Sequence, residues 1–207
     1  MRYESLIFDI DGTLWDSRAL VAEGYNIQLK AEVLAHLCVD AETLKPLFGK
    51  VMTEIADSIL ASIPEKDRYG LMERCMETEN RYLFENECKI GYPGILETVR
   101  ELAKRYRLFI VSNSQCGYPE LCMDKLGLTS YIEGYLCFGD TGTSKGKTIR
   151  TLMEKYRIQS CAYIGDTRGD YEATVEAEVP FIWAAYGFGT PDGYAARIDS
   201  FEELLNL

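Results

Sequence analysis

Hydrophobic positions in the second half of the chain follow two alternating patterns, which indicate strands and helices in turn. Short apolar runs that indicate strands occupy 108–111, 134–138, 161–164 and 180–185. Between and after them, apolar positions recur at helical spacing in 94–106, 118–126, 147–156, 171–178 and 201–205. Strands that alternate with helices predict a parallel sheet covered by helices, which is an α/β fold.

The first part of the chain has a different pattern. One apolar run at 6–8 predicts a buried strand, and the interval from about 16 to 87 then carries helical periods with almost no strand signal. Helices are expected at 19–37, 41–48, 51–63 and 66–84. We therefore expect a core formed by 1–15 and 91–207, and an inserted helical domain at 16–90, with linkers near 14–16 and 90–94.

Two carboxylates follow the first strand directly. In an extended chain, residues two apart point to one side, so Asp9 and Asp11 are expected to lie together, and Gly12 lets the backbone turn after them. Two like charges this close repel each other unless a cation or a shared proton lies between them. The motif therefore indicates a metal site, an acid/base pair or both, with a pair of solvated turn residues as the alternative.

Further polar residues follow the later strands. Ser112, Asp166 and Asp170 fall at or just beyond strand ends, and ligands of open parallel sheets bind at that edge. Carboxylates gathered there need a cation, and oxygen ligands suit Mg²⁺. Taken singly, Ser112 could cap a strand, Asp166 could be a helix N-cap and Asp170 a first-turn acid.

Composition and charge restrict the partners. The chain has 207 residues with 22 basic and 33 acidic side chains, a net charge of -11, and a pI of about 4.7. Such a surface disfavours nucleic acid and anionic membranes, and any phosphate site must be made locally positive. The seven cysteines include no Cys-x-x-Cys pair and the single histidine is His36, which argues against a zinc site and a disulfide framework. With no apolar run long enough for a membrane span and no signal peptide pattern, we expect a cytoplasmic protein.

Four segments together resemble the motifs of the haloacid dehalogenase-like hydrolases. Residues 8–14, Phe-Asp-Ile-Asp-Gly-Thr-Leu, resemble the first motif, and 109–113, Phe-Ile-Val-Ser-Asn, the second. Lys145, in a polar segment before a helical pattern, resembles the third, and 162–170, Ala-Tyr-Ile-Gly-Asp-Thr-Arg-Gly-Asp, the fourth. The motifs occur in the family's order, and the helical insert after the first resembles the phosphoglycolate phosphatase-like subgroup. The resemblance implies a Rossmann-like three-layer core with a helical-bundle cap.

The resemblance also implies roles for the acids. Asp9 would be the nucleophile that forms an aspartyl-phosphate, and Asp11 the general acid and base. The metal ligands would be Asp9, the backbone carbonyl of Asp11, Asp166 and Asp170, and the metal would be Mg²⁺.

The resemblance also implies which residues contact the phosphate and the rest of the substrate. Ser112 and Asn113 would hold phosphate oxygens, and Lys145 would neutralise the nucleophile and the transferring group. Many relatives have proline after this lysine where this chain has glycine, so Lys147 is a competing candidate. Lys50, in a helix-breaking loop of the insert, would contact substrate or remain a solvated lysine.

Aromatic residues near the motifs have no assigned chemistry. Trp15 and Tyr92 could line the cleft or pack at the hinge. The segment 186–189, Tyr-Gly-Phe-Gly, resembles one common in this subgroup, and we expect no catalytic role for it.

The function implied is that of a magnesium-dependent phosphatase acting on a small phosphorylated metabolite, with phosphoglycolate as the leading substrate. Neither nucleic acid nor membrane is an expected partner, and the chain is expected to be a monomer or a homodimer. A phosphomutase of the β-phosphoglucomutase type shares all four motifs and remains an alternative. A non-catalytic binding protein on the same fold is a third possibility, which the intact set of acids disfavours.

Overall fold

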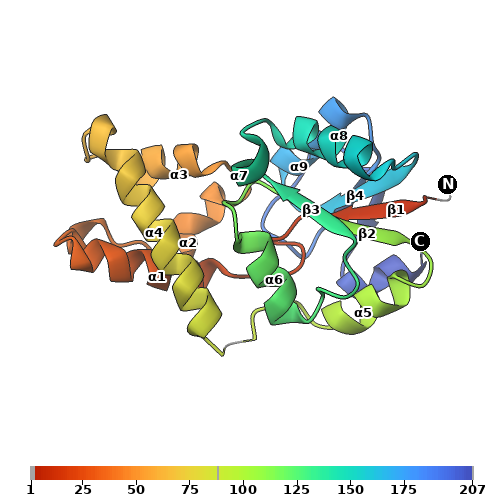
Figure 1. Ribbon diagram of the computed structural model, residues 1–207, viewed down its shortest axis with the longest axis horizontal. Coiled ribbons are helices and arrows are strands. Elements are labelled where there is room, and N and C mark those ends of the chain that lie inside the picture. The colour runs from red at the N-terminus through yellow and green to blue at the C-terminus, as the bar shows by residue number, and fades with distance from the viewer. Residues whose placement is uncertain (1–2, 88, 207) are drawn as a thin grey trace. The chain divides into compact units, whose positions relative to one another are not determined.

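The computed structural model describes residues 3–87 and 89–206, whose path is shown in Figure 1. The chain forms two compact units. One consists of Met1–Asp16 together with Ile90–Leu207, and the other of Ser17–Lys89. We call them the core unit and the helical unit.

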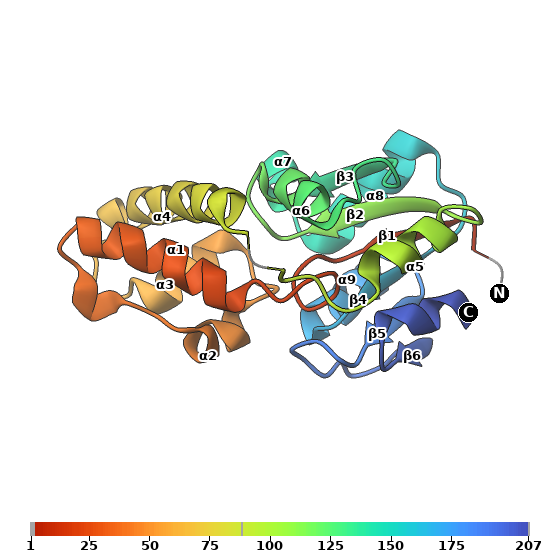
Figure 2. The same cartoon turned by 90° about the horizontal axis from the view of Figure 1, so that it is seen from below.

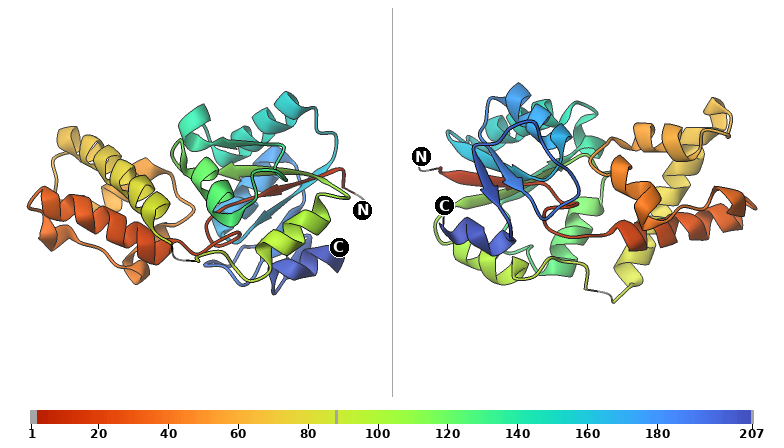
Figure 3. Two further views of the ribbon diagram at one scale, coloured as in Figure 1. Left: turned by 60° about the horizontal axis from the view of Figure 1, so that its bottom comes forward. Right: turned by 180° about the vertical axis from the view of Figure 1, so that it is seen from behind.

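The core unit is built on a six-stranded sheet with the order β3-β2-β1-β4-β5-β6. Every neighbouring pair is parallel, as the alternating pattern predicted. The strands are β1 (Ser5–Phe8), β2 (Arg107–Ser112), β3 (Gly134–Cys137), β4 (Cys161–Gly165), β5 (Phe181–Ala184) and β6 (Ala196–Ile198). The right-hand view of Figure 3 shows β5 and β6, in blue, at the edge opposite to β3. The sequence did not indicate β6, because its three residues contain no apolar run.

Helices cover both faces of this sheet, as Figure 1 shows. On one face lie α8 (Lys145–Tyr156) and α9 (Arg168–Ala177), and on the other lie α5 (Ile95–Leu102) and the 3-10 helix η3 (Phe201–Asn206). Two further helices, α6 (Tyr118–Leu126) and α7 (Phe138–Thr141), follow β2 and β3. The unit is therefore a three-layer α/β fold of the Rossmann type.

Burial on both faces explains why the central strands read as unbroken apolar runs. All four residues of β1 are buried, and Ile7 lies in one apolar cluster with Phe109 of β2 and Ile149 of α8. This core fixes the strands whose carboxyl ends carry the candidate site.

The helical unit consists of α1 (Arg18–Ala31), α2 (Ala41–Leu44), α3 (Met52–Ile59) and α4 (Glu65–Glu85), with 3-10 turns η1 (Ala35–Leu37) and η2 (Lys45–Leu47). Helices α1 and α4 pack side by side (Figure 2). Gly24 permits this approach, because a Cβ there would lie 2.7 Å from the Cα of Glu79. No helix in the described ranges is long and apolar enough to span a membrane.

Three helices in this unit differ from the sequence expectation. The helix expected over 51–63 ends at Ile59. The helix expected over 19–37 ends at Ala31, because the backbone turns left-handed at Val33, with φ of 61°. The helix expected over 41–48 divides into α2 and η2, where Pro46 lacks the amide hydrogen needed to continue an α-helix.

The two linker segments are paired with each other inside the core unit. The amide of Asp16 donates to the carbonyl of Ile90 at 2.8 Å, and the amide of Tyr92 donates to the carbonyl of Leu14 at 3.1 Å. Trp15 and Gly91 form an antiparallel bridge between these contacts. The two segments that connect the units are therefore hydrogen-bonded to each other as a short antiparallel pair.

Candidate active site

Parallel pairing brings the strand ends to one edge of the sheet. Phe8 of β1 is in register with Ile110 of β2 and Ile164 of β4. The amide of Asp9 extends this ladder by donating to the carbonyl of Ile164 at 2.8 Å. Residues that follow these positions, among them Asp9, therefore emerge at the edge where parallel sheets bind ligands.

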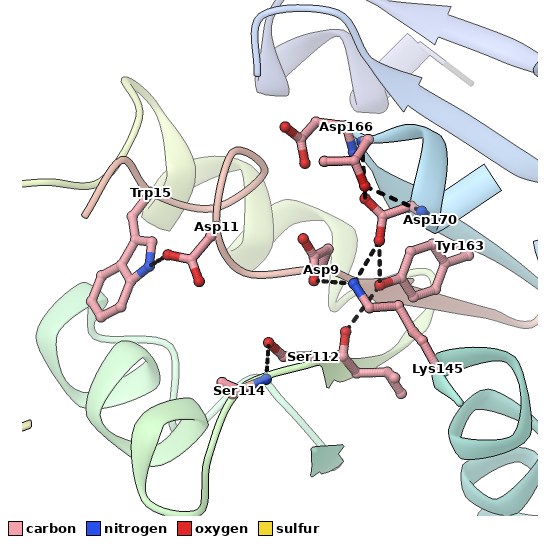
Figure 4. Close-up of polar contacts among 11 residues, drawn as sticks. Asp9, Asp11, Trp15, Ser112, Ser114, Lys145, Tyr163, Asp166 and Asp170 are labelled. Atoms are coloured by element: carbon pink, nitrogen blue, oxygen red, sulfur yellow. Dashed lines mark hydrogen bonds and ion pairs between the residues drawn. The ribbon is translucent and has the colours of Figure 1, made fainter. Parts of the chain in front are cut away.

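Three buried carboxylates meet at this edge (Figure 4). Asp9, Asp166 and Asp170 each place one carboxylate oxygen within 4.8 Å of the others, and none is more than 2% exposed. The ammonium of Lys145 joins two of them, with its Nζ 2.9 Å from Oδ1 of Asp9 and 2.6 Å from Oδ1 of Asp170. A buried charge cluster of this kind is stable only when each charge is compensated.

The helix start at Ser144 explains why Lys145 reaches the cluster. Ser144 caps α8 by accepting from the amide of Lys147, so the helix begins at Lys145, two residues before the expected start. Gly146 allows α8 to lie against α9, because a Cβ there would be 2.8 Å from the carbonyl of Ala173. Lys145 consequently points into the site and is buried, whereas Lys147 is exposed.

Asp170 is fixed by a helix cap as well as by the lysine. Its Oδ2 accepts from the amide and hydroxyl of Thr167, at 2.9 and 2.7 Å, and from the amide of Asp166 at 3.2 Å. Burial raises the pKa of Asp170, but the Lys145 ammonium and these hydrogen bonds outweigh it, so the pKa lies below its ordinary value. Asp170 is therefore both the N-terminal acid of α9 and a member of the site.

The carboxyl groups of Asp9 and Asp166 ionise less readily than that of Asp170. Burial raises the pKa of Asp9 to about 7, although the Lys145 charge opposes the shift and Asp170 adds to it. Burial, followed by repulsion from Asp170 and Asp9, raises the pKa of Asp166 well above its ordinary value. One ammonium is too little positive charge for three buried carboxylates, so the site favours an additional cation.

Asp166 shows where such a cation fits. Its Oδ2 accepts from the amide of Phe188 at 2.6 Å, while its Oδ1 is buried and has no hydrogen-bond partner among the described residues. An unpaired buried carboxylate oxygen costs free energy unless it binds a cation or a donor. The oxygen-only set of Asp9, Asp166 and Asp170 therefore fits a hard divalent ion such as Mg²⁺.

Asp11 lies apart from this cluster. Its Oδ1 accepts hydrogen bonds from Nε1 of Trp15 and from the hydroxyl of Tyr118, both at 2.8 Å. Figure 4 shows its carboxylate directed toward Trp15 and away from Asp9. The expectation that Asp9 and Asp11 point to one side fails because β1 ends at Phe8 and the chain then turns.

Of the remaining expected residues, Ser112 and Asn113 lie close to the cluster along the sheet, whereas Lys50 belongs to the helical unit. Ser112 ends β2, is 4% exposed, and accepts from the amide of Ser114 at 3.2 Å, while the half-buried Asn113 follows it. These two residues lie at the same edge of the sheet as Asp9. Lys50 is exposed in the helical unit, between η2 and α3.

The segment 186–188 contributes contacts that the sequence analysis missed. Besides the Phe188 amide on Asp166, Gly187 packs so closely that a Cβ there would lie 2.5 Å from Oδ2 of Asp166 and would overlap the carbonyl oxygen of Gly12. Gly12, with φ of 81°, leaves similarly little room beside Asp166. The available signal was a glycine-rich turn directly after an apolar strand, at the ligand-binding edge of the sheet.

Tyr186 connects the same segment to the first motif. Its hydroxyl donates to the carbonyl of Thr13 at 2.8 Å, and its ring lies edge-on to Tyr92 with centroids 4.8 Å apart. The turn after β5 thus contacts both the Asp166 carboxylate and the loop that follows Asp9.

The fold and site define a Rossmann-type α/β enzyme with a carboxylate and lysine cluster at the carboxyl ends of its strands. A sequence model described as "Haloacid dehalogenase-like hydrolase" matches residues 6–184. The chain belongs to this family, as its four motifs indicated.

Individual relatives agree with the family assignment. A phosphoglycolate phosphatase of Agrobacterium fabrum is 30% identical over 190 residues, covering 88% of this chain and 80% of that protein. A 5'-nucleotidase of Pseudomonas aeruginosa is 25% identical over 212 residues, covering 95% and 89% of the two chains. A crystal structure from Haemophilus somnus, described as a predicted phosphoglycolate phosphatase, matches the fold with a TM-score of 0.84 at 19% identity, over 100% of this chain and 98% of that one.

Proposed function

We propose that this chain, a phosphatase of the haloacid dehalogenase-like family, hydrolyses a small phosphomonoester with Mg²⁺ through an aspartyl-phosphate on Asp9. The observation that carries the proposal is the buried cluster in which Lys145 joins Asp9 to Asp170 while Oδ1 of Asp166 stays unpaired. This arrangement supplies a nucleophile, a fixed positive charge and a place for a cation.

Asp9 is the nucleophile because it lies at the ligand-binding edge of the sheet and its carboxylate is paired with the Lys145 ammonium. Its carboxylate oxygen attacks phosphorus, forming a bond to it as the bond to the departing alcohol oxygen breaks. The Lys145 ammonium, 2.9 Å from that carboxylate, keeps it oriented and offsets negative charge on the phosphoryl group. Ser112 and Asn113, at the end of β2, would donate hydrogen bonds to phosphate oxygens.

Asp166 and Asp170, with Asp9 and the backbone carbonyl of Asp11, would hold the magnesium ion. When bound, Mg²⁺ neutralises charge on the carboxylates and on the phosphate oxygens. The segment 186–188 holds Asp166 in the rotamer that leaves Oδ1 available, because the Phe188 amide occupies Oδ2.

Asp11 would move the protons. It protonates the alcohol as it leaves, then takes a proton from the water that attacks the aspartyl-phosphate, which releases inorganic phosphate and restores Asp9. Trp15 and Tyr118 hold its carboxylate in the observed position, so a rotation about its side-chain bonds has to precede proton transfer.

The substrate class follows from the relatives and from the helical unit. Phosphoglycolate is the first candidate, and nucleoside monophosphates the second, because relatives carry both names. We propose that the helical unit acts as a cap over the substrate and that Lys50 contributes to specificity by contacting a carboxylate or phosphate.

The test is phosphate release from a panel of phosphorylated metabolites, with Mg²⁺ and with a chelator. The proposal predicts metal-dependent release that Asp9→Asn abolishes and that Asp124→Asn, at an exposed acid in α6, preserves. Release that is unchanged by the chelator or by Asp9→Asn would refute it. Lys50→Ala should raise KM for the best substrate more than it lowers kcat.

A further inference from the structure

A second cluster of metal-ligating side chains lies at the β3 edge of the sheet. Cys116 follows β2, Cys137 is the last residue of β3, and Asp140 is in α7. One ligand atom from each lies within 4.8 Å of the other two. Cys137 is buried, whereas Cys116 and Asp140 are exposed, so water and ions reach the cluster from outside.

Distances within the cluster are close to those between ligands of a tetrahedral metal. Sγ of Cys137 lies 3.2 Å from Oδ2 of Asp140, and Sγ of Cys116 lies 3.8 Å from its Oδ1. With Zn–S of about 2.3 Å and Zn–O of about 2.0 Å, tetrahedral angles separate sulfur from oxygen by roughly 3.5 Å and the two sulfurs by roughly 3.8 Å. The two observed sulfur–oxygen distances, one to each oxygen of Asp140, lie on either side of the first value, and one ligand atom from each of the three residues lies within 4.8 Å of the others.

The backbone holds these side chains in place before any ion binds. Asp140 and Cys137 form a reciprocal pair, in which the Asp140 amide donates to the Cys137 sulfur and the Cys137 amide donates to Oδ2 of Asp140 at 2.8 Å. Burial, followed by the hydrogen bond to the Asp140 carboxylate, raises the pKa of the Cys137 thiol to about 12, so this thiol gives up its proton only as a metal ion binds. Gly139 lets the Cys116 loop approach, because a Cβ there would lie 2.7 Å from the Cys116 sulfur.

We propose that Cys116, Cys137 and Asp140 bind a thiophilic divalent cation of the Zn²⁺ class, with water as the fourth ligand. Thiolate ligands select such an ion over Mg²⁺, so this site and the oxygen-only cluster around Asp9 take different metals. Each thiol loses its proton to solvent when the metal–sulfur bond forms. The site does not depend on the proposed phosphatase activity.

A disulfide between the same two cysteines explains less of the geometry. Both thiols contact the Asp140 carboxylate, Cys116 at Oδ1 and Cys137 at Oδ2, which places a third ligand group beside the two sulfurs. A disulfide has no use for a carboxylate between its cysteines, and its formation would need an external oxidant.

Cobalt titration of the reduced, metal-free protein tests the proposal. The titration is run in a phosphine reductant with excess Mg²⁺ to fill the oxygen site, and the readout is the thiolate-to-cobalt charge-transfer absorption. The proposal predicts a band that saturates at one equivalent of Co²⁺ and that one equivalent of Zn²⁺ removes.

Variants assign the band to these residues. Cys116→Ser, an exposed change that should leave the fold intact by circular dichroism, should weaken Co²⁺ binding by more than about 10-fold, and Asp140→Asn should weaken it as well. Cys38→Ser is the matched control, because Cys38 lies in the helical unit, and it should bind like the wild type. Absence of the band in the wild type, or an unchanged Co²⁺ affinity in Cys116→Ser, would overturn the proposal. So would a Cys116–Cys137 disulfide formed in air by a protein that binds no Zn²⁺ after reduction.

Discussion

At the scale of single residues, the position of one ammonium group determines which carboxylates carry charge. Burial alone works against the Lys145 cation, but the charges on Asp170 and Asp9 outweigh it and raise its pKa above the ordinary value. The same contacts keep Asp170 ionised, while Asp166 depends on a further cation. The ionisation of each of these four side chains therefore depends on the charges of the other three.

Replacing Lys145 should affect catalysis far more than replacing its neighbour. Lys145→Met keeps the aliphatic stem but removes the charge beside the nucleophile, so kcat/KM should fall at least about 100-fold. Lys147→Ala is the matched control, since this side chain is exposed on the same helix, and should stay within about twofold of the wild type. Equal losses in the two variants, measured with saturating Mg²⁺, would show that Lys145 has no special role.

Gly187 should matter for metal binding rather than for folding. In Gly187→Ala the new Cβ displaces Asp166, so the apparent Kd for Mg²⁺ should rise by roughly 10–100-fold. Gly169→Ala is the control, because a Cβ there would meet nothing closer than 3.6 Å in α9. Calorimetric titration of both variants decides the matter, and an unchanged Kd in Gly187→Ala would contradict the positioning role.

Single positions also show where sequence reasoning reached its limit. Asp9, Asp166 and Asp170 could be placed at one edge, because parallel strands end together. The orientation of Asp11 could not, because it depends on donors from Trp15 and from Tyr118, which is distant in sequence.

At the scale of elements, the residues at which helices start and end were harder to predict than the presence and order of the helices. The strand and helix order of the core unit followed from periodicity, and the parallel sheet is confirmed. The start of α9 at Arg168 instead of 171 depends on the Thr167 cap, and the end of α1 on one left-handed residue. Hydrophobic periodicity carries neither signal, since caps and turns are set by single polar contacts or backbone angles.

The packing of α1 on α4 should depend on a single glycine. Gly24→Ala places a Cβ 2.7 Å from backbone of α4 and should lower the free energy of unfolding of the helical unit by about 1–3 kcal/mol. Gly70→Ala, at a helical position of α4 whose Cβ would meet only an Arg74 nitrogen at 3.8 Å, should instead be neutral or stabilising by up to about 1 kcal/mol. Urea denaturation followed by circular dichroism measures both. An unchanged free energy of unfolding in Gly24→Ala would contradict the claim that the packing of α1 on α4 depends on this glycine.

At the scale of the whole molecule, the protein is strongly acidic, yet its proposed substrate is an anion. The net charge of -11 disfavours anion binding over most of the surface. The site counters this with a buried lysine and with carboxylates arranged to bind a cation. Metal binding should therefore change the stability of the folded chain as well as its activity.

Thermal unfolding with and without Mg²⁺ measures that linkage. A ligand at 100 times its Kd stabilises the folded state by about 2.7 kcal/mol, which for a chain of this size should raise Tm by roughly 5–10 °C. Asp166→Asn should lose most of this shift because it removes the unpaired oxygen. Equal shifts in both proteins would place the ion elsewhere.

Direct detection of a phosphoryl group on Asp9 tests the central claim. Asp11→Asn should stall hydrolysis of the intermediate, while p-nitrophenyl phosphate, whose leaving group needs no proton, still transfers its phosphoryl group. With Mg²⁺ and an acid quench, we predict a burst of about one nitrophenolate per chain and a phosphoryl group, located by mass spectrometry, on the peptide that contains Asp9. The double variant Asp9→Asn, Asp11→Asn should show neither. A burst with the label on another residue, or turnover that persists in Asp9→Asn, would contradict the account.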